Sequence, residues 1–561
     1  MNETANRPWL SSYPAGVPAD VDASQYQSLV QLMEESFRAY ADRPAYSFMG
    51  NDVSFGQTDA ASRAFAAYLQ GLGLAKGDRV ALMMPNVPQY PVAVAAVLRA
   101  GLVVVNVNPL YTPRELEHQL KDSGAKAIVI VENFANTLQQ CIAATSVRHV
   151  VLAAMGDQLG LVKGTIVNFV VRKVKKMVPA YSLPGAVRFN HALAKGAAGA
   201  FRKPEIQADD VAVLQYTGGT TGVSKGAVLL HRNIIANVLQ SQLWNQPVMD
   251  KVPAGEQPTA VCALPLYHIF AFTVGMMLSM RTGGKLILIP NPRDLAGVLQ
   301  ELSKHTFHSF PAVNTLFNGL AHHPDFNKVN WKNLKVSVGG GMAVQGAVAK
   351  LWLEKTGCPI CEGYGLSETS PSASCNPTTS TEFTGTIGVP LPGTWMKCID
   401  DEGNEVPVGQ AGEIAIKGPQ VMAGYWQRPD ETAKVMTADG YFKSGDIGVM
   451  DARGYFRIVD RKKDMVLVSG FNVYPNEVED VVAQLDGVLE CAVVGVPDEK
   501  TGEAVKLVIV RKDPHLTEEK VREFCRANLT GYKQPRVIEF RADLPKTPVG
   551  KILRRELRDA K

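Results

Sequence analysis

Residues 79–131 read RVALMMPNVPQYPVAVAAVLRAGLVVVNVNPLYTPRELEHQLKDSGAKAIVIV and decide the fold class. Apolar, β-branched runs alternate there with longer segments of helical pattern. Strands are expected at 79–84, 102–107 and 127–131, and helices at 89–99 and 112–124. The second helix opens on a capping box, with Thr112 as N-cap, proline next and Glu115 three residues on, and it should stop at Gly124. This order predicts an α/β fold with a parallel sheet covered by helices.

The length of 561 residues predicts more than one domain. We expect a large N-terminal domain, 1–462, of parallel and mixed sheets covered by helices, and a small α+β C-terminal lid domain, 463–561. The break is placed in the charged run 460–464. In the small domain we expect helices at 476–484 and from the Thr517 cap to Asn528, and strands at 488–496 and 504–511.

Charge and cysteine content exclude several classes of protein. Lys plus Arg is 58 and Asp plus Glu is 54, a net charge of +4 that gives no sign of a nucleic-acid binder. Eight scattered cysteines are too sparse for a disulfide framework and favour a reducing, cytoplasmic compartment. The pair Cys358 and Cys361 fits a buried strand better than a zinc or redox site. The N-terminus lacks a charged leader followed by an apolar core, so no secretory signal is expected.

Two segments raise the question of membrane contact. Residues 261–280 have no charged side chain, but Pro265 and His268 interrupt them, so a buried strand-turn-helix is favoured over a span. Residues 159–181 carry cations and no acid. The cations are Lys163, Arg172, Lys173, Lys175 and Lys176, and the apolar stripe is Ile166, Phe169, Val170, Val174, Met177 and Val178. An interfacial helix on an anionic bilayer and a surface helix packed on the core both fit this pattern and remain open.

An apolar strand at 211–216 runs into Thr217-Gly-Gly-Thr-Thr-Gly-Val-Ser-Lys-Gly226. Glycines let backbone N–H groups approach an anion, hydroxyls donate to phosphate oxygens, and lysine adds a point charge, so the loop predicts a polyphosphate cradle. It is not a Walker A loop, because Val223 and Ser224 separate glycine from lysine. Gly222 to Gly226 also match the G-x-S-x-G elbow of α/β-hydrolases, which keeps Ser224 as a remote alternative nucleophile.

The loop resembles the phosphate loop of the adenylate-forming enzymes, the superfamily of acyl-CoA synthetases, luciferase and nonribosomal adenylation domains. Further matching motifs follow in the same order. They are Gly339-Gly-Gly341, Glu362-Gly-Tyr-Gly-Leu-Ser-Glu-Thr369, Ser444-Gly-Asp446, Asp460-Arg461, Ser469-Gly-Phe-Asn-Val-Tyr-Pro475 and Pro548-Val-Gly-Lys551. Six motifs in order are a far more specific signal than one.

Residues 439–463, DGYFKSGDIGVMDARGYFRIVDRKK, resemble the signature of fatty acyl-CoA synthetases, and the whole chain is similar to bacterial long-chain members of that family. Tyr441, Lys443 and Ser444 depart from its usual Trp, His and Thr, which bears on acyl preference more than on the reaction. The resemblance implies a ligase that makes acyl-AMP and pyrophosphate from a fatty acid and ATP, then acyl-CoA and AMP with CoA, for fatty acid uptake and β-oxidation.

The resemblance also implies the residues of the site. Those expected at ATP or AMP are Thr217, Gly218, Gly219, Thr220, Thr221, Gly222, Lys225, Gly339, Gly340, Gly341, Glu362, Tyr364, Gly365, Thr369, Asp446 and Arg461. Thr217 and Lys225 would hold phosphates, and Glu368 with Thr217 would hold Mg²⁺. Asp446 would accept from the ribose with Arg461 beside it, Tyr364 would face adenine, and Thr369 would contact the α-phosphate.

The catalytic set is Lys551, Glu368, Thr217 and Lys225, with Lys551 bridging the carboxylate and the α-phosphate. The resemblance implies that the small domain then swings about a hinge at Lys463. Ser469, Gly470 and Phe471 would reach the CoA side, and His268 would line or gate the acyl site. A solvated basic tail is the other interpretation of Lys551, and a satisfied core histidine that of His268.

Mg²⁺ is the one metal expected, and CoA is a co-substrate. The rivals are a medium-chain or aryl-acid synthetase, a fatty acyl-AMP ligase, and a non-catalytic nucleotide- or lipid-binding module. Dimers are common among the enzymes it resembles, so a homodimer stays open, as do chain length and peripheral membrane contact.

Overall fold

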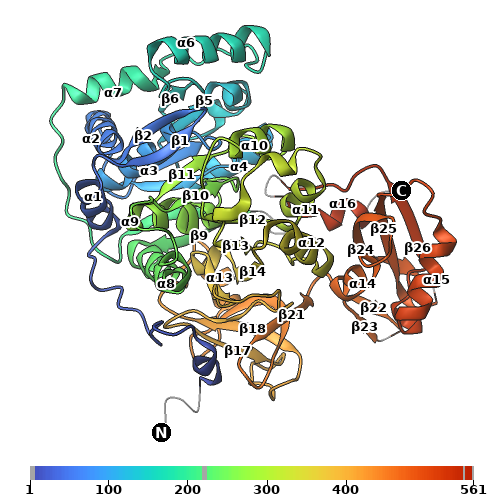
Figure 1. Ribbon diagram of the computed structural model, residues 1–561. Helices are drawn as coiled ribbons and strands as arrows, with labels where there is room; N and C mark the ends of the chain where they lie inside the picture. The colour runs from blue at the N-terminus through green and yellow to red at the C-terminus, as the bar shows by residue number, and fades with distance from the viewer. Residues whose placement is uncertain (1–6, 218–223, 470, 499, 548–549, 559–561) are drawn as a thin grey trace.

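A computed structural model describes residues 7–217, 224–469, 471–498, 500–547 and 550–558. The chain up to Arg461 forms three sheets with their helices, and the rest forms a smaller red unit at the right of Figure 1. The helices of eight or more residues are α1 (Leu29–Ala39), α2 (Phe55–Gly71), α3 (Gln89–Arg99), α4 (Pro113–Ser123), α6 (Leu161–Phe169), α7 (Phe189–Ala197), α8 (His231–Met249), α10 (Leu295–Leu302), α11 (Asn314–His322), α12 (Gly346–Thr356), α14 (Pro475–Val482) and α15 (Glu518–Asn528).

The stretch 79–131 lies in an eight-stranded sheet. Its order is β19 (Gly424–Tyr425), β9 (Lys225–Leu230), β8 (Val211–Thr217), β4 (Val103–Asn106), β3 (Arg79–Met83), β5 (Ala127–Val131), β6 (His149–Ala153) and β7 (Val187–Arg188). From β8 to β7 the strands are parallel, while β9 pairs antiparallel with β8 and β19. The Thr112–Glu115 capping box and the left-handed Gly124 are present, so the predicted parallel α/β unit is confirmed.

A nine-stranded sheet forms the second layer. Its order is β16 (Val389–Pro390), β15 (Ser372–Cys375), β14 (Ile360–Gly365), β13 (Val336–Gly339), β12 (Ser309–Ala312), β10 (Thr259–Cys262), β11 (Lys285–Leu288), β1 (Pro44–Phe48) and β2 (Asn51–Ser54). Every residue of α3 is buried, and one apolar cluster joins α3 and α8 to strands of both sheets. The core therefore fixes the two sheets relative to each other.

The uncharged stretch 261–280 is a buried strand-turn-helix, as expected. β10 is followed by the π-helical segment η6 (Ala271–Met277) and α9 (Leu278–Thr282), and most of these residues are buried. Among the described residues, no helix combines the length and apolar character needed to cross a bilayer.

The domain boundary falls between two sheets. The third sheet orders β17 (Trp395–Ile399), β18 (Gly412–Lys417), β20 (Phe442–Met450) and β21 (Phe456–Arg461). The fourth orders β23 (Phe471–Val473), β22 (Val466–Val468), β25 (Gly502–Arg511) and β24 (Val488–Asp498), with β26 (Val537–Arg541) on β25. The expected α+β elements of the small unit are confirmed, whereas Lys463 as the hinge remains a prediction.

The basic segment 159–181 forms α6, which continues into the π-helical turn η5 (Val170–Val174) at the top of Figure 1. Ile166, Phe169, Val174 and Met177 are each more than half exposed, at 58%, 59%, 63% and 53%. Four of the six stripe residues therefore do not pack on the core, whereas Val170 and Val178 are half-buried. All eight cysteines are buried and unpaired, with Cys361 on β14.

Candidate active site

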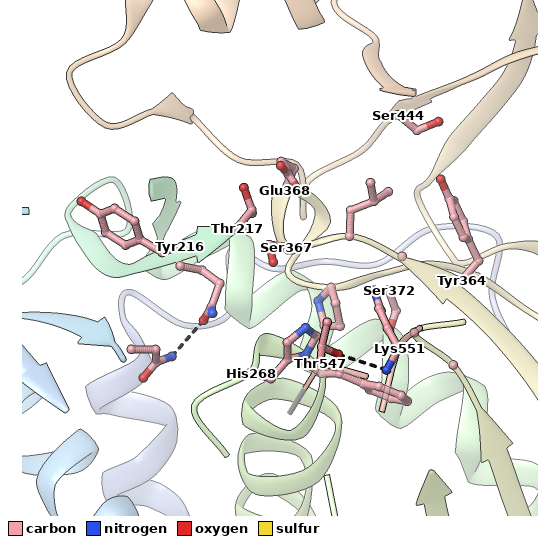
Figure 2. Close-up of a pocket in the computed structure, with 18 of the residues that line it drawn as sticks. Tyr216, Thr217, His268, Tyr364, Ser367, Glu368, Ser372, Ser444, Thr547 and Lys551 are labelled. Atoms are coloured by element: carbon pink, nitrogen blue, oxygen red, sulfur yellow. Dashed lines mark hydrogen bonds between the residues drawn. The ribbon is translucent and has the colours of Figure 1, made fainter. Parts of the chain in front are cut away.

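A cavity of about 1030 Å³ is lined by residues of both domains. Thr217, Tyr364 and Glu368 come from the large domain, and Lys463 and Lys551 from the small one. Figure 2 shows Thr217, Ser367 and Glu368 on one side of this space and His268, Thr547 and Lys551 on the other. The structure thus gathers residues that lie more than 300 positions apart in the sequence.

One side of the cavity is built by an antiparallel strand pair. Thr217 ends β8 and Lys225 begins β9, and the two are register partners. The predicted residues Gly218, Gly219, Thr220, Thr221 and Gly222 lie outside the described residues. The Lys225 ammonium forms an ion pair with the Glu431 carboxylate of α13 (Pro429–Val435) and lies 5.1 Å from the centre of the Tyr425 ring.

Ser224, the nucleophile expected if the chain were an α/β-hydrolase, has no general base at its hydroxyl among the described residues. Ser224 precedes its strand instead of following one, and its hydroxyl donates to the Thr217 carbonyl at 2.7 Å. The His118 ring contacts the Ser224 carbonyl oxygen at 3.0 Å rather than the hydroxyl. A nucleophilic serine needs a base at its hydroxyl, so this geometry argues against a hydrolase.

Glu368 lies in the short turn Ser367–Thr369 and is 7% exposed. The Tyr425 hydroxyl donates to its Oε1 at 2.8 Å. Burial raises the pKa of Glu368 above its ordinary value, and the Tyr425 hydrogen bond opposes that shift. A buried carboxylate that lines the cavity fits Mg²⁺, which usually takes one or two carboxylates together with substrate phosphates.

Tyr364 and Asp446 are buried and form a polar cluster with Arg461, whose side chain is partly exposed. The Tyr364 hydroxyl donates to Asp446 Oδ2 at 2.7 Å, and Arg461 Nε lies 3.0 Å from Asp446 Oδ1. Asp446 on β20 and Arg461 on β21 are register partners, which is why the sheet brings them together. Tyr364 and Arg461 line the cavity directly, with Asp446 behind them.

Glycines allow the backbone to approach this site closely. A Cβ on Gly340 would lie 2.9 Å from the Phe270 ring, and one on Gly339 2.5 Å from Val344. Gly341 has φ +81° and would place a Cβ 3.6 Å from Lys551 Cε. Gly365 lines the cavity where a Cβ would lie 1.9 Å from a carbonyl oxygen. Larger residues would fill the space or strain the backbone.

Lys551 and His268 face the same part of the cavity. Burial and then the charge of Arg461 lower the pKa of Lys551 to about 8. Burial and then the charge of Lys551 lower the pKa of His268 to about 3, so this imidazole is neutral at physiological pH. Burial and then Arg461 also lower the pKa of Lys463, which lines the cavity.

Thr369 and Glu362, two of the residues predicted at the nucleotide, do not line the cavity. Thr369 is fully buried and does not line the cavity, because its hydroxyl accepts from Leu366 N at 2.9 Å and donates to the Pro371 carbonyl. Its neighbour Ser367 lines the cavity instead. Glu362 also turns away, since its Oε1 accepts from Val344 N at 3.1 Å. Both residues shape the loops of the site and do not face the cavity.

The residues expected on the CoA side lie apart from the cavity. Ser469 donates its N–H to the Thr501 carbonyl at 2.9 Å, and Phe471 is 57% exposed and stacks on Tyr532 at 4.9 Å. Gly470 lies outside the described residues. The structure therefore brings Lys551 into the cavity while Phe471 lies outside it.

Sequence reasoning missed the segment 424–435. The pairing of Tyr425 with Ala227 puts Tyr425 against Glu368 and Glu431 against Lys225. No motif marks these residues, and only the β9–β19 pairing could have identified them.

Comparisons with known proteins match two parts of the chain. Residues 33–426 match the family model "AMP-binding enzyme", and residues 477–551 match "AMP-binding enzyme C-terminal domain". A long-chain-fatty-acid–CoA ligase of Salmonella typhimurium is 56% identical over 552 residues, covering 98% of each chain. One of Bacillus subtilis is 36% identical, covering 99% of this chain and 98% of the relative.

Solved structures show the same architecture. ATP-bound MatB from Rhodopseudomonas palustris has a TM-score of 0.78 and 29% identity, covering 94% of this chain and 98% of its own. An anthranilate CoA ligase in complex with anthranoyl-AMP has a TM-score of 0.84 at 24% identity, covering 96% and 98%, and shows the fold alone.

Proposed function

This chain belongs to the AMP-binding enzyme family, and from that premise we propose that it joins long-chain fatty acids to CoA in an ATP-dependent, AMP-forming reaction. The observation that carries the proposal is the cavity in which Lys551 of the small domain meets Glu368 and the Tyr364–Asp446–Arg461 cluster of the large one. A nucleotide-binding module has no need of a distal lysine at this place.

In the first half-reaction, a carboxylate oxygen attacks the α-phosphorus of ATP, and the bond to pyrophosphate breaks. Two anions must approach each other, so cations and N–H groups have to screen them and hold them in line. In this proposal the Lys551 ammonium bridges the carboxylate and the α-phosphate, and Thr217 and Lys225 hold the β- and γ-phosphates; all three residues line the cavity. Ser367 replaces Thr369 beside the α-phosphate in this proposal.

The Tyr364–Asp446–Arg461 cluster provides the nucleoside side. In this proposal Asp446 accepts from the ribose hydroxyls, and its ion pair with Arg461 holds the carboxylate in one orientation. Tyr364 faces the adenine, and Gly340 and Gly341 let the base approach the backbone. His268, being neutral, lines the acyl entrance without adding charge.

Glu368 and Thr217 would hold Mg²⁺, which neutralises phosphate charge and eases the departure of pyrophosphate. The Tyr425 hydrogen bond keeps one carboxylate oxygen of Glu368 in place, leaving the other for the ion. One carboxylate combined with substrate phosphates is a usual arrangement for this metal.

In the second half-reaction, the CoA thiolate attacks the acyl carbonyl and AMP leaves. We infer that the small domain, residues 463–561, turns about Lys463, withdrawing Lys551 and bringing Ser469, Gly470 and Phe471 to the cavity. The exposure of Phe471 supports this inference, because an aromatic ring at 57% exposure lacks a fixed partner on the large domain. One cavity thus serves two reactions.

Location and assembly belong to the same proposal. We propose a cytoplasmic enzyme that touches a membrane peripherally, because its substrate is poorly soluble in water. A homodimer is proposed from the resemblance alone, and light scattering after gel filtration tests it.

Pyrophosphate–ATP exchange with saturated acids of graded length tests the reaction and ranks its substrates. We expect exchange that requires Mg²⁺ and a fatty acid and is fastest for long chains, with AMP formed once CoA is added. If exchange is fastest with medium-chain or aryl acids, those acids are the substrates instead. AMP formation that does not depend on CoA would favour an acyl-AMP ligase. The absence of any exchange would contradict the proposal.

A further inference from the structure

The segment 161–177, here called the docking helix, exposes a cluster of large apolar side chains. It contains six of the thirteen large apolar side chains that are exposed among the described residues. They are Leu161 (91%), Val162 (77%), Ile166 (58%), Phe169 (59%), Val174 (63%) and Met177 (53%). A soluble surface normally scatters such residues singly, so their concentration on one helix indicates a contact surface.

The opposite face of the docking helix is already anchored. Gly164 is buried so closely that an added Cβ would lie 2.4 Å from the Gly156 carbonyl oxygen. Asn168 Oδ1 accepts from Gly156 N at 2.8 Å, and Arg172 pairs with the buried Glu132 at 2.7 Å. Because these contacts fix the helix, its apolar face cannot simply turn inward to the core.

The charge beside this face is positive. Lys173, Lys175 and Lys176 are exposed, and none of them forms an ion pair within the part of the chain that the structure describes. Residues 159–181 contain no Asp or Glu. An apolar face bordered by cations is complementary to a bilayer with anionic headgroups.

We propose that the docking helix is the surface by which this protein lies on an anionic lipid bilayer. Its fourteen helical residues from 161 to 174 span about 21 Å, short of the ~30 Å hydrocarbon core, so it lies in the plane of the interface. A second copy of the chain fits less well, because a two-fold contact would bring the same three lysines of both copies together. The biological purpose, access to membrane-dissolved fatty acid, rests on the proposed function, but the binding does not.

Vesicle flotation with the full-length protein tests the proposal, using phosphatidylglycerol–phosphatidylcholine vesicles against pure phosphatidylcholine. We expect the wild type to float with the anionic vesicles and to bind less as salt rises. Ile166→Gln with Phe169→Gln should weaken binding at least tenfold, because two side chains lose their apolar insertion. Replacing Lys173, Lys175 and Lys176 by Gln should weaken it roughly 100-fold at low salt, about fivefold for each charge.

Val408→Gln is the matched control, since Val408 is 55% exposed but lies outside the docking helix. It should bind like the wild type, and all variants should keep the circular dichroism spectrum and melting temperature of the wild type, which shows that they are folded. Absent flotation of the wild type, or undiminished flotation of the Ile166 and Phe169 variant, would overturn the proposal. So would a change from dimer to monomer in that variant, which would mark a protein interface. Flotation without ligase activity would overturn the proposed function alone.

Discussion

The replacement of Lys551 by arginine tests the electrostatics of the cavity. The pKa of Lys551 is lowered to about 8, so the free enzyme should hold a protonated lysine at pH 7 and mostly a neutral one at pH 9. If the ammonium bridges the two reacting anions, kcat/KM for ATP must fall as the pH rises through 8. For a pKa of about 8, the protonated fraction drops from ~0.9 at pH 7 to ~0.1 at pH 9, so kcat/KM should fall roughly tenfold.

The assay is pyrophosphate–ATP exchange from pH 6.5 to 9.5, because kcat/KM reports the ionisation of the free enzyme. An arginine stays charged over this whole range. Lys551→Arg should therefore be slower than the wild type at pH 7, because its side chain has a different shape. Its kcat/KM should not fall as the pH rises through 8; this fall in the wild type is called the alkaline limb.

Glu362 is one competing titration, because burial raises its pKa to about 8 as well, and Lys463, whose pKa burial lowers, is another. Glu362→Gln keeps an oxygen for the Val344 N–H and removes the ionisation, so it should leave the alkaline limb unchanged. A limb that survives in Lys551→Arg but disappears in Glu362→Gln would refute the reasoning.

Three further substitutions test other parts of the structure. Asp446→Asn removes the charge that pairs with Arg461. We expect the affinity for ATP, measured by calorimetry, to fall at least tenfold and the free energy of unfolding to fall by about 1–3 kcal/mol. An unchanged affinity for ATP would exclude Asp446 from the ribose site. Glu431→Gln removes a carboxylate that the phosphates of ATP must displace from Lys225. We therefore expect the variant to bind ATP about threefold more tightly than the wild type. Weaker binding would mean that Glu431 positions the lysine. Trp352 is fully buried, and its ring centre lies 4.7 Å from that of Phe317. Trp352→Ala should lower the free energy of unfolding of the large domain, measured with denaturant, by about 3–5 kcal/mol. A loss under about 1 kcal/mol would contradict the packing described.

The sequence predicts the fold well where the residues that start and end an element lie within or next to that element. The helix 113–123 has a capping box at its start and a left-handed glycine at its end, and both are present. The uncharged stretch 261–280 was separable from a membrane span because Pro265 and His268 interrupt it. Such features depend on residues close in the sequence, which is why they can be read without a structure.

In the site, only the residues that belong to sequence motifs could be predicted. Thr369 and Ser367 are two residues apart, and which hydroxyl faces the cavity depends on the turn between them. Tyr425 and Glu431 reach the site through a strand pairing across about 200 residues, which no local pattern encodes. Exposure of the docking helix depends on the Gly156–Gly164 contact, whereas its amphipathic sequence fits burial equally well.

The partial reactions of Lys551→Ala test the central claim most directly, that one cavity serves two reactions with different residues of the small domain. We predict a loss of pyrophosphate–ATP exchange by about 10²–10³, since a positioned charge is removed from the transition state. Conversion of supplied acyl-AMP and CoA to the thioester should stay within about threefold of the wild type, because Lys551 is then withdrawn. Equal loss of both half-reactions would contradict the account.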